Sequence, residues 1–299
     1  MIENKLMALK TDLLNSKFEF DFSDKDFNTL RDLVTGHTGI ELPDNKKTLM
    51  YTRLVRRLRE LSLPGFQEYI KIVNAELENG KSTEMMNMVN AMTTNVTGFF
   101  RENHHFEDLA ARLPELYQKM GKLRIWSCAA STGQEPWSIA MVVHDFMEKN
   151  PGCKDVKIVP TDIDVNVIRT AEAGIYEIAT PEVESNTYLK KYLKPYTAEQ
   201  PSSIIKTASL YRINDKLRDL VQFHTMNLLK SWAVLGAGYN VVFCRNVIIY
   251  FSKETQRGLF KNISAKMPSG SLLYIGHSES LLNVSEDFSP TGRTSYFKK

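Results

Sequence analysis

The sequence contains few cysteines and no long apolar run. Cys128, Cys153 and Cys244 are the 3 cysteines among 299 residues, and no two of them have the C-x-x-C spacing of a zinc or redox site. No stretch approaches the roughly 18 consecutive apolar residues that a membrane span needs, and the charged N-terminus lacks the apolar core of a signal peptide. We therefore expect a soluble, cytoplasmic protein without a disulfide framework or a membrane insertion.

Strong net charge and phosphate-binding motifs are also missing. The formal net charge is only +3, which does not favour a dedicated nucleic-acid binder. Neither G-x-G-x-x-G nor G-x-x-x-x-G-K-[ST] occurs, which argues against dinucleotide and nucleoside triphosphate sites. No coiled-coil heptads or long apolar stripes appear, so a monomer is expected.

The first part of the chain, residues 1–92, has a helical pattern. Ser23 and Asp26 form an S-x-x-D capping pattern before an amphipathic run. Further helices are predicted over residues 46–61, 66–77 and 83–92, with glycine and proline at the breaks. Short connections between them predict a small all-α domain.

The rest of the chain, residues 93–299, has the alternation of an α/β fold. Short apolar runs at 124–128, 156–159 and 240–244 alternate with helical patterns, which predicts a parallel sheet with crossover helices. Two more strands are expected at 271–275 and 294–297, the last as an antiparallel edge strand. A polar, tyrosine-rich stretch of about residues 175–218 interrupts the alternation and is interpreted as a small inserted β subdomain.

Two carboxylates follow predicted strands, where an open α/β sheet binds its ligand. Glu135 belongs to C-A-A-S-T-G-Q-E-P, between the first strand and a helix; it suits either a favourable helix-dipole position or a cationic ligand. Asp162 in T-D-I-D stands where an acid commonly binds ribose hydroxyls, whereas Asp164 suits a helix N-cap equally well. A metal site is not expected at Asp162 and Asp164, because no histidine or further carboxylate flanks these two residues.

Two further motifs combine polar and aromatic residues. Residues 243–251, F-C-R-N-V-I-I-Y-F, continue a predicted central strand into polar residues; Tyr250 alone would suit a core position. Residues 95–101, N-V-T-G-F-F-R, lie between the two predicted domains. Core packing would explain the two phenylalanines but not the asparagine, the threonine and the arginine beside them.

Along the chain, these motifs come in the order N-V-T-G-F-F-R, A-A-S-T-G-Q-E-P, T-D-I-D and F-C-R-N-V-I-I-Y-F. In this order, and together with G-H-S-E-S at residues 276–280, they resemble the CheR family of chemotaxis receptor methyltransferases over nearly the whole chain. The resemblance implies a class I S-adenosylmethionine-dependent methyltransferase, Rossmann-like, with an N-terminal all-α domain for receptor recognition. It implies a protein-glutamate O-methyltransferase that esterifies glutamates of methyl-accepting chemotaxis receptors and leaves S-adenosylhomocysteine. The implied cofactor-binding residues are Asn95, Thr97, Arg101, Glu135, Asp162, Asn227, Leu228, Arg245 and Asn246, and the implied catalytic residues are Arg101 and Tyr250.

The sequence departs from the family pattern at two places. Gln134 stands where the family often has a second acid, so Glu135 is the expected carboxylate contact. The insert at residues 196–204, YTAEQPSSI, lacks the glycine-rich loop of members that dock on a receptor's C-terminal pentapeptide. Tethering by a pentapeptide is therefore doubtful for this chain.

A basic helix is the candidate partner surface. Between residues 45 and 60, six basic residues against Glu60 give a charge of +5. Arg53, Arg56, Arg57 and Arg59 are the candidate contacts to the cytoplasmic helical domain of a receptor, although charge alone suits a solvated helix face equally well. The alternatives are a nucleic-acid methyltransferase that uses this helix on phosphate, and a non-catalytic sensor of S-adenosylmethionine.

Overall fold

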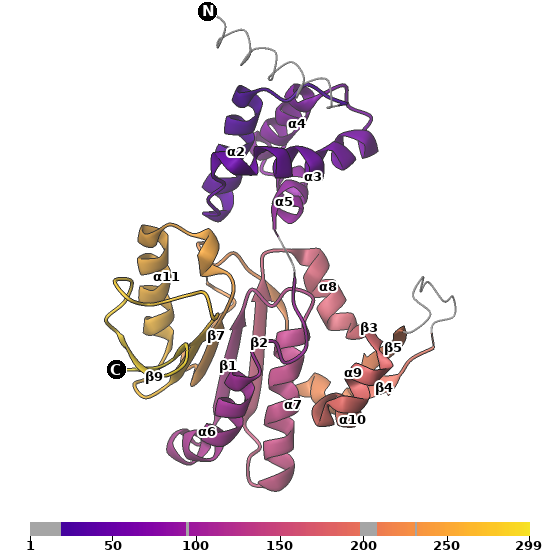
Figure 1. Ribbon diagram of the computed structural model, residues 1–299. Coiled ribbons are helices and arrows are strands. Elements are labelled where there is room, and N and C mark those ends of the chain that lie inside the picture. Colours follow the sequence, from indigo (N-terminus) through magenta and orange to yellow (C-terminus); the bar gives the residue numbers. More distant parts are fainter. Residues whose placement is uncertain (1–18, 94–95, 198–207, 231) are drawn as a thin grey trace, which may run out of the picture. The chain divides into compact units, whose positions relative to one another are not determined.

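The computed structural model describes residues 19–93, 96–197, 208–230 and 232–299. The chain divides into two compact units, Met1–Thr94 and Asn95–Lys299 (Figure 1). None of the described helices is long and apolar enough to cross a membrane.

The first unit is a bundle of helices. It contains α2 (Asp24–Thr38), the 3₁₀ turn η1 (Asp44–Lys46), α3 (Lys47–Glu60), α4 (Phe66–Glu78) and α5 (Thr83–Met92). The predicted capping box starts α2: the Ser23 hydroxyl accepts a hydrogen bond from the Asp26 N–H, and the Asp26 carboxylate accepts one from the Ser23 N–H. Apolar side chains at helical spacing, among them Leu30, Met50 and Leu54, are fully buried and form the core.

The second unit is built on a seven-stranded sheet in the order β6-β2-β1-β7-β8-β10-β9. The parallel strands are β1 (Leu123–Cys128), β2 (Val156–Asp162), β6 (His224–Thr225), β7 (Val241–Cys244) and β8 (Leu272–Ile275). Strands β9 (Phe288–Gly292) and β10 (Ser295–Lys298) are antiparallel. The fold is therefore a Rossmann-like α/β sheet, mostly parallel with antiparallel strands at one end, as the sequence predicts. The prediction that the last strand lies at the edge is wrong: β9 pairs outside β10, because the chain after β8 first forms β9 and then turns back between the two strands.

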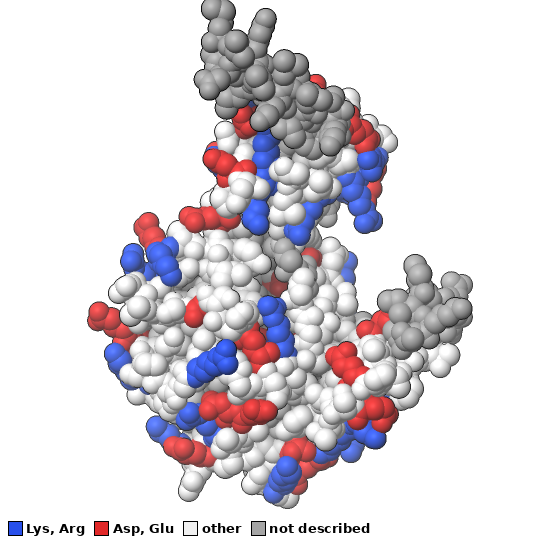
Figure 2. Space-filling view, viewed as in Figure 1, with Lys and Arg blue, Asp and Glu red and all other residues white. Residues whose placement is uncertain are grey.

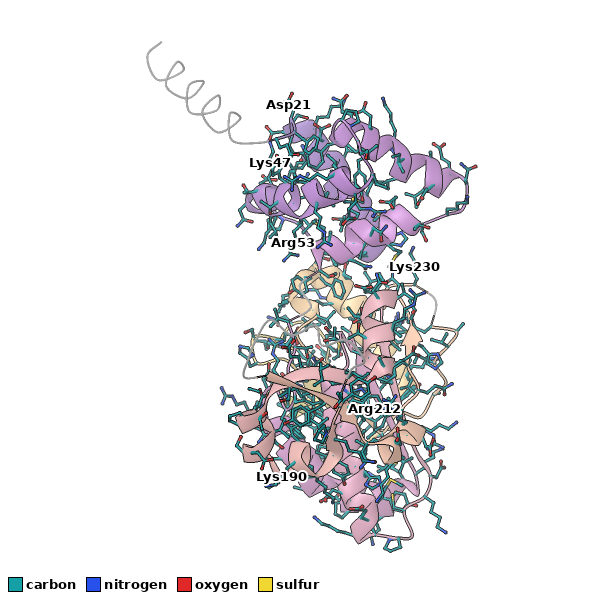
Figure 3. The ribbon with its side chains drawn as sticks, turned by 90° about the vertical axis from the view of Figure 1, so that its right-hand side faces the viewer. Asp21, Lys47, Arg53, Lys190, Arg212 and Lys230 are labelled. Carbon is teal, nitrogen blue, oxygen red and sulfur yellow. The ribbon has the colours of Figure 1, made fainter. Side chains whose placement is uncertain are left out.

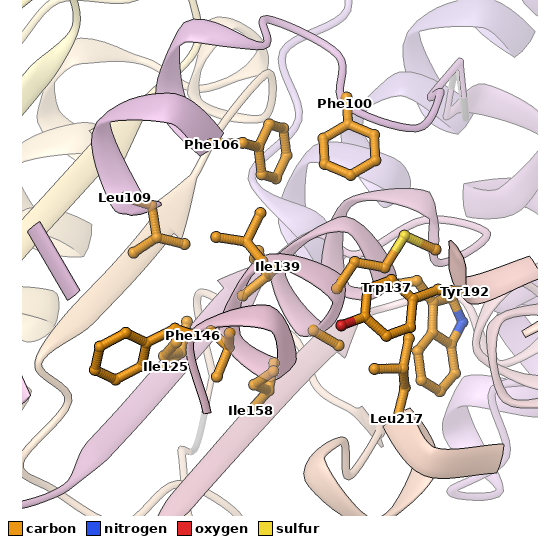
Figure 4. Close-up of a cluster of buried hydrophobic side chains, with 14 of the residues drawn as sticks. Phe100, Phe106, Leu109, Ile125, Trp137, Ile139, Phe146, Ile158, Tyr192 and Leu217 are labelled. Carbon is orange, nitrogen blue, oxygen red and sulfur yellow. The ribbon is translucent and has the colours of Figure 1, made fainter. Parts of the chain in front are cut away.

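Four longer helices precede or follow the strands of this sheet along the chain. They are α6 (His104–Met120), α7 (Gln134–Lys149), α8 (Val165–Ala173) and α11 (Lys253–Lys266). Apolar side chains of α6 and α7, including Leu109 and Ile139, pack with Ile125 and Ile158 of the sheet in one buried cluster (Figure 4). Trp126, the next residue along β1, lies on the opposite face and packs against Trp232 and Tyr239. Successive side chains of a strand point to opposite faces of the sheet. Ile125 therefore packs against α6 and α7, whereas Trp126 packs on the other face.

The polar stretch between the sheet strands forms a separate antiparallel sheet of three strands, in the order β3-β5-β4. These are β3 (Ile175–Ala179), β4 (Leu193–Pro195) and β5 (Ala208–Ile213). The short helices α9 (Thr180–Ser185) and α10 (Thr187–Tyr192) lie between β3 and β4, and the 3₁₀ turn η2 (Asp215–Leu220) follows β5. Most of the loop of residues 196–204, on which the expectation about a pentapeptide depends, lies outside the described residues.

Candidate active site

The carboxyl ends of four parallel strands meet at one edge of the large sheet. In the registers of the sheet, Cys128 at the end of β1 lies beside Thr161 of β2 and Cys244 of β7, and Asp162 lies beside Thr225 of β6. The segments that follow these strands therefore start side by side. Ligands of open α/β sheets bind in this position. Outside residues 95–101, the site residues predicted from the sequence lie here: Asp162 ends β2, Glu135 lies at the start of α7, and the others follow β6 or β7, namely Asn227, Leu228, Arg245, Asn246 and Tyr250.

Asp162 is a buried carboxylate at the end of β2. Its Oδ2 accepts the N–H of Ser131 at 2.8 Å, and its Oδ1 accepts the N–H of Asp164 at 2.9 Å. Burial raises the pKa of Asp162, and the two backbone donors oppose that shift. Each oxygen retains a lone pair, so the group can still accept hydrogen bonds from a diol. Asp164 itself is the N-cap of α8, as its alternative interpretation predicted.

Glu135 and Arg245 form a buried ion pair. Arg245, which follows β7, donates through Nη1 to Oε2 of Glu135 at 2.9 Å, and Ser127 of β1 donates to Oε1 of the same carboxylate at 2.7 Å. The Arg245 side chain is only 1% exposed and that of Glu135 15%. Burial raises the pKa of Glu135, whereas the charge of Arg245 and the Ser127 hydroxyl lower it.

Glu102 is a site residue that the sequence did not reveal. It follows Arg101, and its carboxylate lies 3.3 Å from Nη2 of Arg245 and accepts hydrogen bonds from Nδ2 of Asn246 and from His277. Burial by itself would raise the pKa of Glu102, but His277, Arg245 and Asn246 together lower it to about 2. Arg245 therefore lies between two carboxylates, Glu135 and Glu102. A lone glutamate in a loop gives no periodic or motif signal for such a role.

Backbone strain is concentrated around these groups. Eight non-glycine residues have a positive φ in the described part of the chain, and five of them, Phe100, Glu102, Ala129, Ser131 and Asn246, lie in the segments described above. Such conformations cost on the order of 1–3 kcal/mol each and persist only where surrounding contacts hold them. Asn246, with φ of 56°, directs the chain from β7 into the 3₁₀ turn η3 (Ile248–Tyr250).

The two candidate catalytic residues border this edge from different segments. Arg101 is partly exposed, and its Nη1 donates to the carbonyl of Val96 at 2.8 Å, while its own carbonyl accepts a hydrogen bond from Arg245. Tyr250 ends η3, and its side chain is 36% exposed rather than packed in the core. Thr97 is partly buried, and Asn95 lies outside the described residues.

Asn227 and Leu228 follow β6, next to Asp162. The N–H of Met226 donates to the Asp162 carbonyl at 2.7 Å, which continues the pairing of β6 with β2 by one residue. The Asn227 Oδ1 then accepts the Leu229 N–H at 2.8 Å and closes a local turn, and Leu228 is buried. This turn places an apolar side chain and a backbone segment beside the proposed diol-binding carboxylate.

These groups fit S-adenosylmethionine chemically. Asp162 can accept from the ribose hydroxyls, and Glu135 and Arg245 offer opposite charges for the ammonium and carboxylate of the methionine part. Nε of Arg245 is buried and has no hydrogen-bond partner among the described residues. Those residues also contain no group of three or more histidine, cysteine, aspartate or glutamate side chains placed to hold a metal ion.

The four candidate partner arginines of α3 differ in their environment. Arg53, labelled in Figure 3, donates to the carbonyls of Ala91, Met92 and Thr93 and thereby caps α5. Arg57 pairs with the buried Glu84 and with Glu60.

Arg56 and Arg59 are 86% and 61% exposed, and they pair with Glu60 and Glu19. Acidic side chains lie beside basic ones on the visible face of this unit (Figure 2).

Comparison with known proteins follows the division into two units. Residues 95–297 match the family model "CheR methyltransferase, SAM binding domain", and residues 25–93 match "CheR methyltransferase, all-alpha domain". The chain is thus an S-adenosylmethionine-dependent methyltransferase.

Relatives of similar sequence agree with this class. A chemotaxis protein methyltransferase of Salmonella typhimurium is 36% identical over 95% of this chain and 93% of its own length. Chemotaxis protein methyltransferase 2 of Pseudomonas aeruginosa is 38% identical over 93% of this chain and 94% of its own, and the Escherichia coli relative is 34% identical over 95% and 94%. The chain belongs to the CheR methyltransferase family.

Proposed function

We propose that this protein transfers the methyl group of S-adenosylmethionine to glutamate carboxylates on the helical cytoplasmic domain of chemotaxis receptors. The observation that carries the proposal is the arrangement at one sheet edge of Asp162, the Glu135–Arg245 pair and the segment of Arg101, with Tyr250 at the rim. The products are a glutamate methyl ester and S-adenosylhomocysteine, and the modification serves adaptation in chemosensory signalling.

The reaction requires little acid–base chemistry from the protein. The cofactor supplies an electrophilic methyl group on a sulfonium: its S–CH₃ bond breaks as an O–CH₃ bond forms. A glutamate with an ordinary pKa of about 4.3 is already ionised at neutral pH, so no general base is needed. The side chains of the site therefore have to bind, to orient and to exclude water, and orientation alone can supply roughly 7–11 kcal/mol in the best cases.

Arg101 and Tyr250 are the residues that we assign to the incoming carboxylate. Both are partly exposed at the edge of the site, whereas Arg245 is buried between two acids and is not free to meet a protein substrate. A guanidinium and a phenol can each donate a hydrogen bond to a carboxylate oxygen. Their role is to hold that oxygen in line with the methyl group.

The helical unit is proposed to recognise the receptor, through Arg56 and Arg59. These two side chains are exposed, whereas Arg53 and Arg57 mainly stabilise the bundle itself. An acidic methylation helix would gain association rate and specificity from such contacts. Esterification removes one negative charge from the receptor, so it weakens the attraction between the methylated helix and these arginines. Tethering through a receptor pentapeptide is not part of this proposal.

The direct experiment is transfer of labelled methyl from S-adenosylmethionine to receptor-containing membranes, followed by mild alkali. Release of volatile methanol is expected, because carboxyl methyl esters hydrolyse under these conditions. The control is the Arg101→Ala variant, which should bind S-adenosylhomocysteine but transfer far less label. Alkali-stable label would instead indicate nitrogen or nucleic-acid methylation, and cofactor binding without any transfer would indicate a sensor.

A further inference from the structure

Glu279, in the motif G-H-S-E-S, is a buried carboxylate that binds no part of the proposed substrates. It lies four residues after the end of β8 and is only 7% exposed. Its oxygens accept four backbone N–H groups: Oε2 accepts those of Gly276 at 2.5 Å and Asn246 at 3.0 Å, and Oε1 accepts those of Val247 and Ile248 at 3.0 Å. No side-chain cation pairs with it among the described residues.

Three of these four donors belong to the turn of residues 246–248, which joins β7 to η3 and includes the first residue of η3. Successive N–H groups that converge on one anion form a nest, and here the nest needs the left-handed conformation of Asn246. The turn begins directly after Arg245 and ends with η3, which contains Tyr250. The Glu279 carboxylate therefore determines the path of the segment that presents a cofactor residue and a candidate catalytic residue.

The fourth donor, Gly276, makes this arrangement sterically specific. A Cβ atom at residue 276 would lie 2.5 Å from Nδ2 of Asn246 and 2.8 Å from Oε2 of Glu279. Only glycine allows the two segments to approach this closely. On the other side of the turn, Glu102 accepts a hydrogen bond from Nδ2 of Asn246, so both the backbone and the side chain of Asn246 are held by carboxylates.

We infer that Glu279 is a positioning residue for methyl transfer, which acts through its hydrogen bonds to the turn of residues 246–248; the inference rests on the proposed function of that turn. Burial raises the pKa of Glu279, and the four N–H groups oppose this shift. An amide in its place would point an NH₂ group at two of the four backbone donors. The turn would then lose one acceptor atom and its two hydrogen bonds, and it would relax from the strained conformation of Asn246.

The test compares E279Q, E279D and G276A in the full chain by calorimetric titration with S-adenosylhomocysteine and by steady-state methyl transfer. E279Q should weaken binding at least about tenfold, because even one buried N–H without an acceptor costs this much and the turn that presents Arg245 and Asn246 would shift to avoid it. G276A should have a similar effect for a steric reason, since its Cβ would lie 2.5 Å from Nδ2 of Asn246. Both variants should also lower kcat, since Tyr250 moves with the turn. E279D retains the charge and should recover part of both losses. The matched control is E286Q, which changes an exposed glutamate that also lies between β8 and β9. It should change neither the affinity for S-adenosylhomocysteine nor kcat.

A merely structural role predicts a different result. It would lower the binding stoichiometry, which reports the folded fraction, while leaving the dissociation constant and the kcat of the folded enzyme unchanged, and this outcome would overturn the inference. D162N is measured in parallel. Impaired binding by D162N with normal binding and turnover by E279Q would reject the role of Glu279 alone, whereas normal binding by D162N as well would reject the cofactor site on which the inference depends.

Discussion

Replacement of Arg245 by methionine tests the central electrostatic claim about the site. Arg245 is 1% exposed and lies 2.9 Å from Glu135 and 3.3 Å from Glu102. Methionine replaces the aliphatic part of arginine but carries no charge, so the variant leaves two buried carboxylates without their shared cation. Removing one partner of a buried ion pair costs about 3–5 kcal/mol of unfolding free energy.

The pH dependence of this loss follows from Glu102. Its pKa of about 2 in the folded protein is below the ordinary value, so in the wild type its ionised form stabilises the fold above the ordinary pKa, and that contribution disappears only as the pH falls toward 2. In R245M, Glu102 and Glu135 are buried without a cation, so either can take up a proton when the protein folds. The free energy needed for this proton uptake grows as the pH rises. The deficit should therefore shrink by up to about 2.7 kcal/mol per such carboxyl between pH 7 and pH 5.

Denaturant titration followed by tryptophan fluorescence measures this effect. The 3 tryptophans, Trp126, Trp137 and Trp232, all lie in the unit Asn95–Lys299, so the signal reports unfolding of the methyltransferase unit. The control is R212M, which breaks an exposed pair with Asp215 at 2.8 Å and should cost less than about 1 kcal/mol.

The double variant R245M/E135Q should be less destabilised than R245M, since it contains one unpaired carboxylate fewer. A loss no larger than that of R212M, or a loss equal at pH 5 and pH 7, would refute the reasoning.

Three further variants address binding, turnover and recognition. D162N replaces an acceptor that also receives the Ser131 and Asp164 N–H groups, so the dissociation constant for S-adenosylhomocysteine should rise about tenfold or more by calorimetry, with unchanged affinity as the contrary result. Y250F removes one hydroxyl from a partly exposed residue and should lower kcat several-fold with little change in cofactor affinity or melting temperature; an unchanged kcat would remove the phenol from the mechanism. R56E/R59E should raise the KM for receptor membranes, increasingly so at low salt, while K71E elsewhere on the helical unit should not; equal effects would point to net charge alone.

Local sequence patterns predicted most elements because local forces determine them. The capping box at Ser23 and Asp26 and the apolar period of α5 depend on residues three or four apart, and the predicted span 83–92 agrees with α5. The apolar runs at 124–128, 156–159, 240–244 and 271–275 likewise correspond to the strands β1, β2, β7 and β8. The sequence pattern does not predict the short strands β6 and β9, because β6 has two residues and β9 contains a proline and a glycine.

The sequence by itself determined the two kinds of domain, the class of enzyme and the positions of Asp162 and Glu135 after their strands. Tertiary structure alone decided what surrounds them. Arg245 meets Glu135 across 110 residues, and Glu279 meets Asn246 across 33, so no local period or spacing encodes either contact. It also separated the arginines of α3 into two that hold the bundle and two that are exposed, because a helix face shows charge in the sequence but not the neighbour that neutralises it.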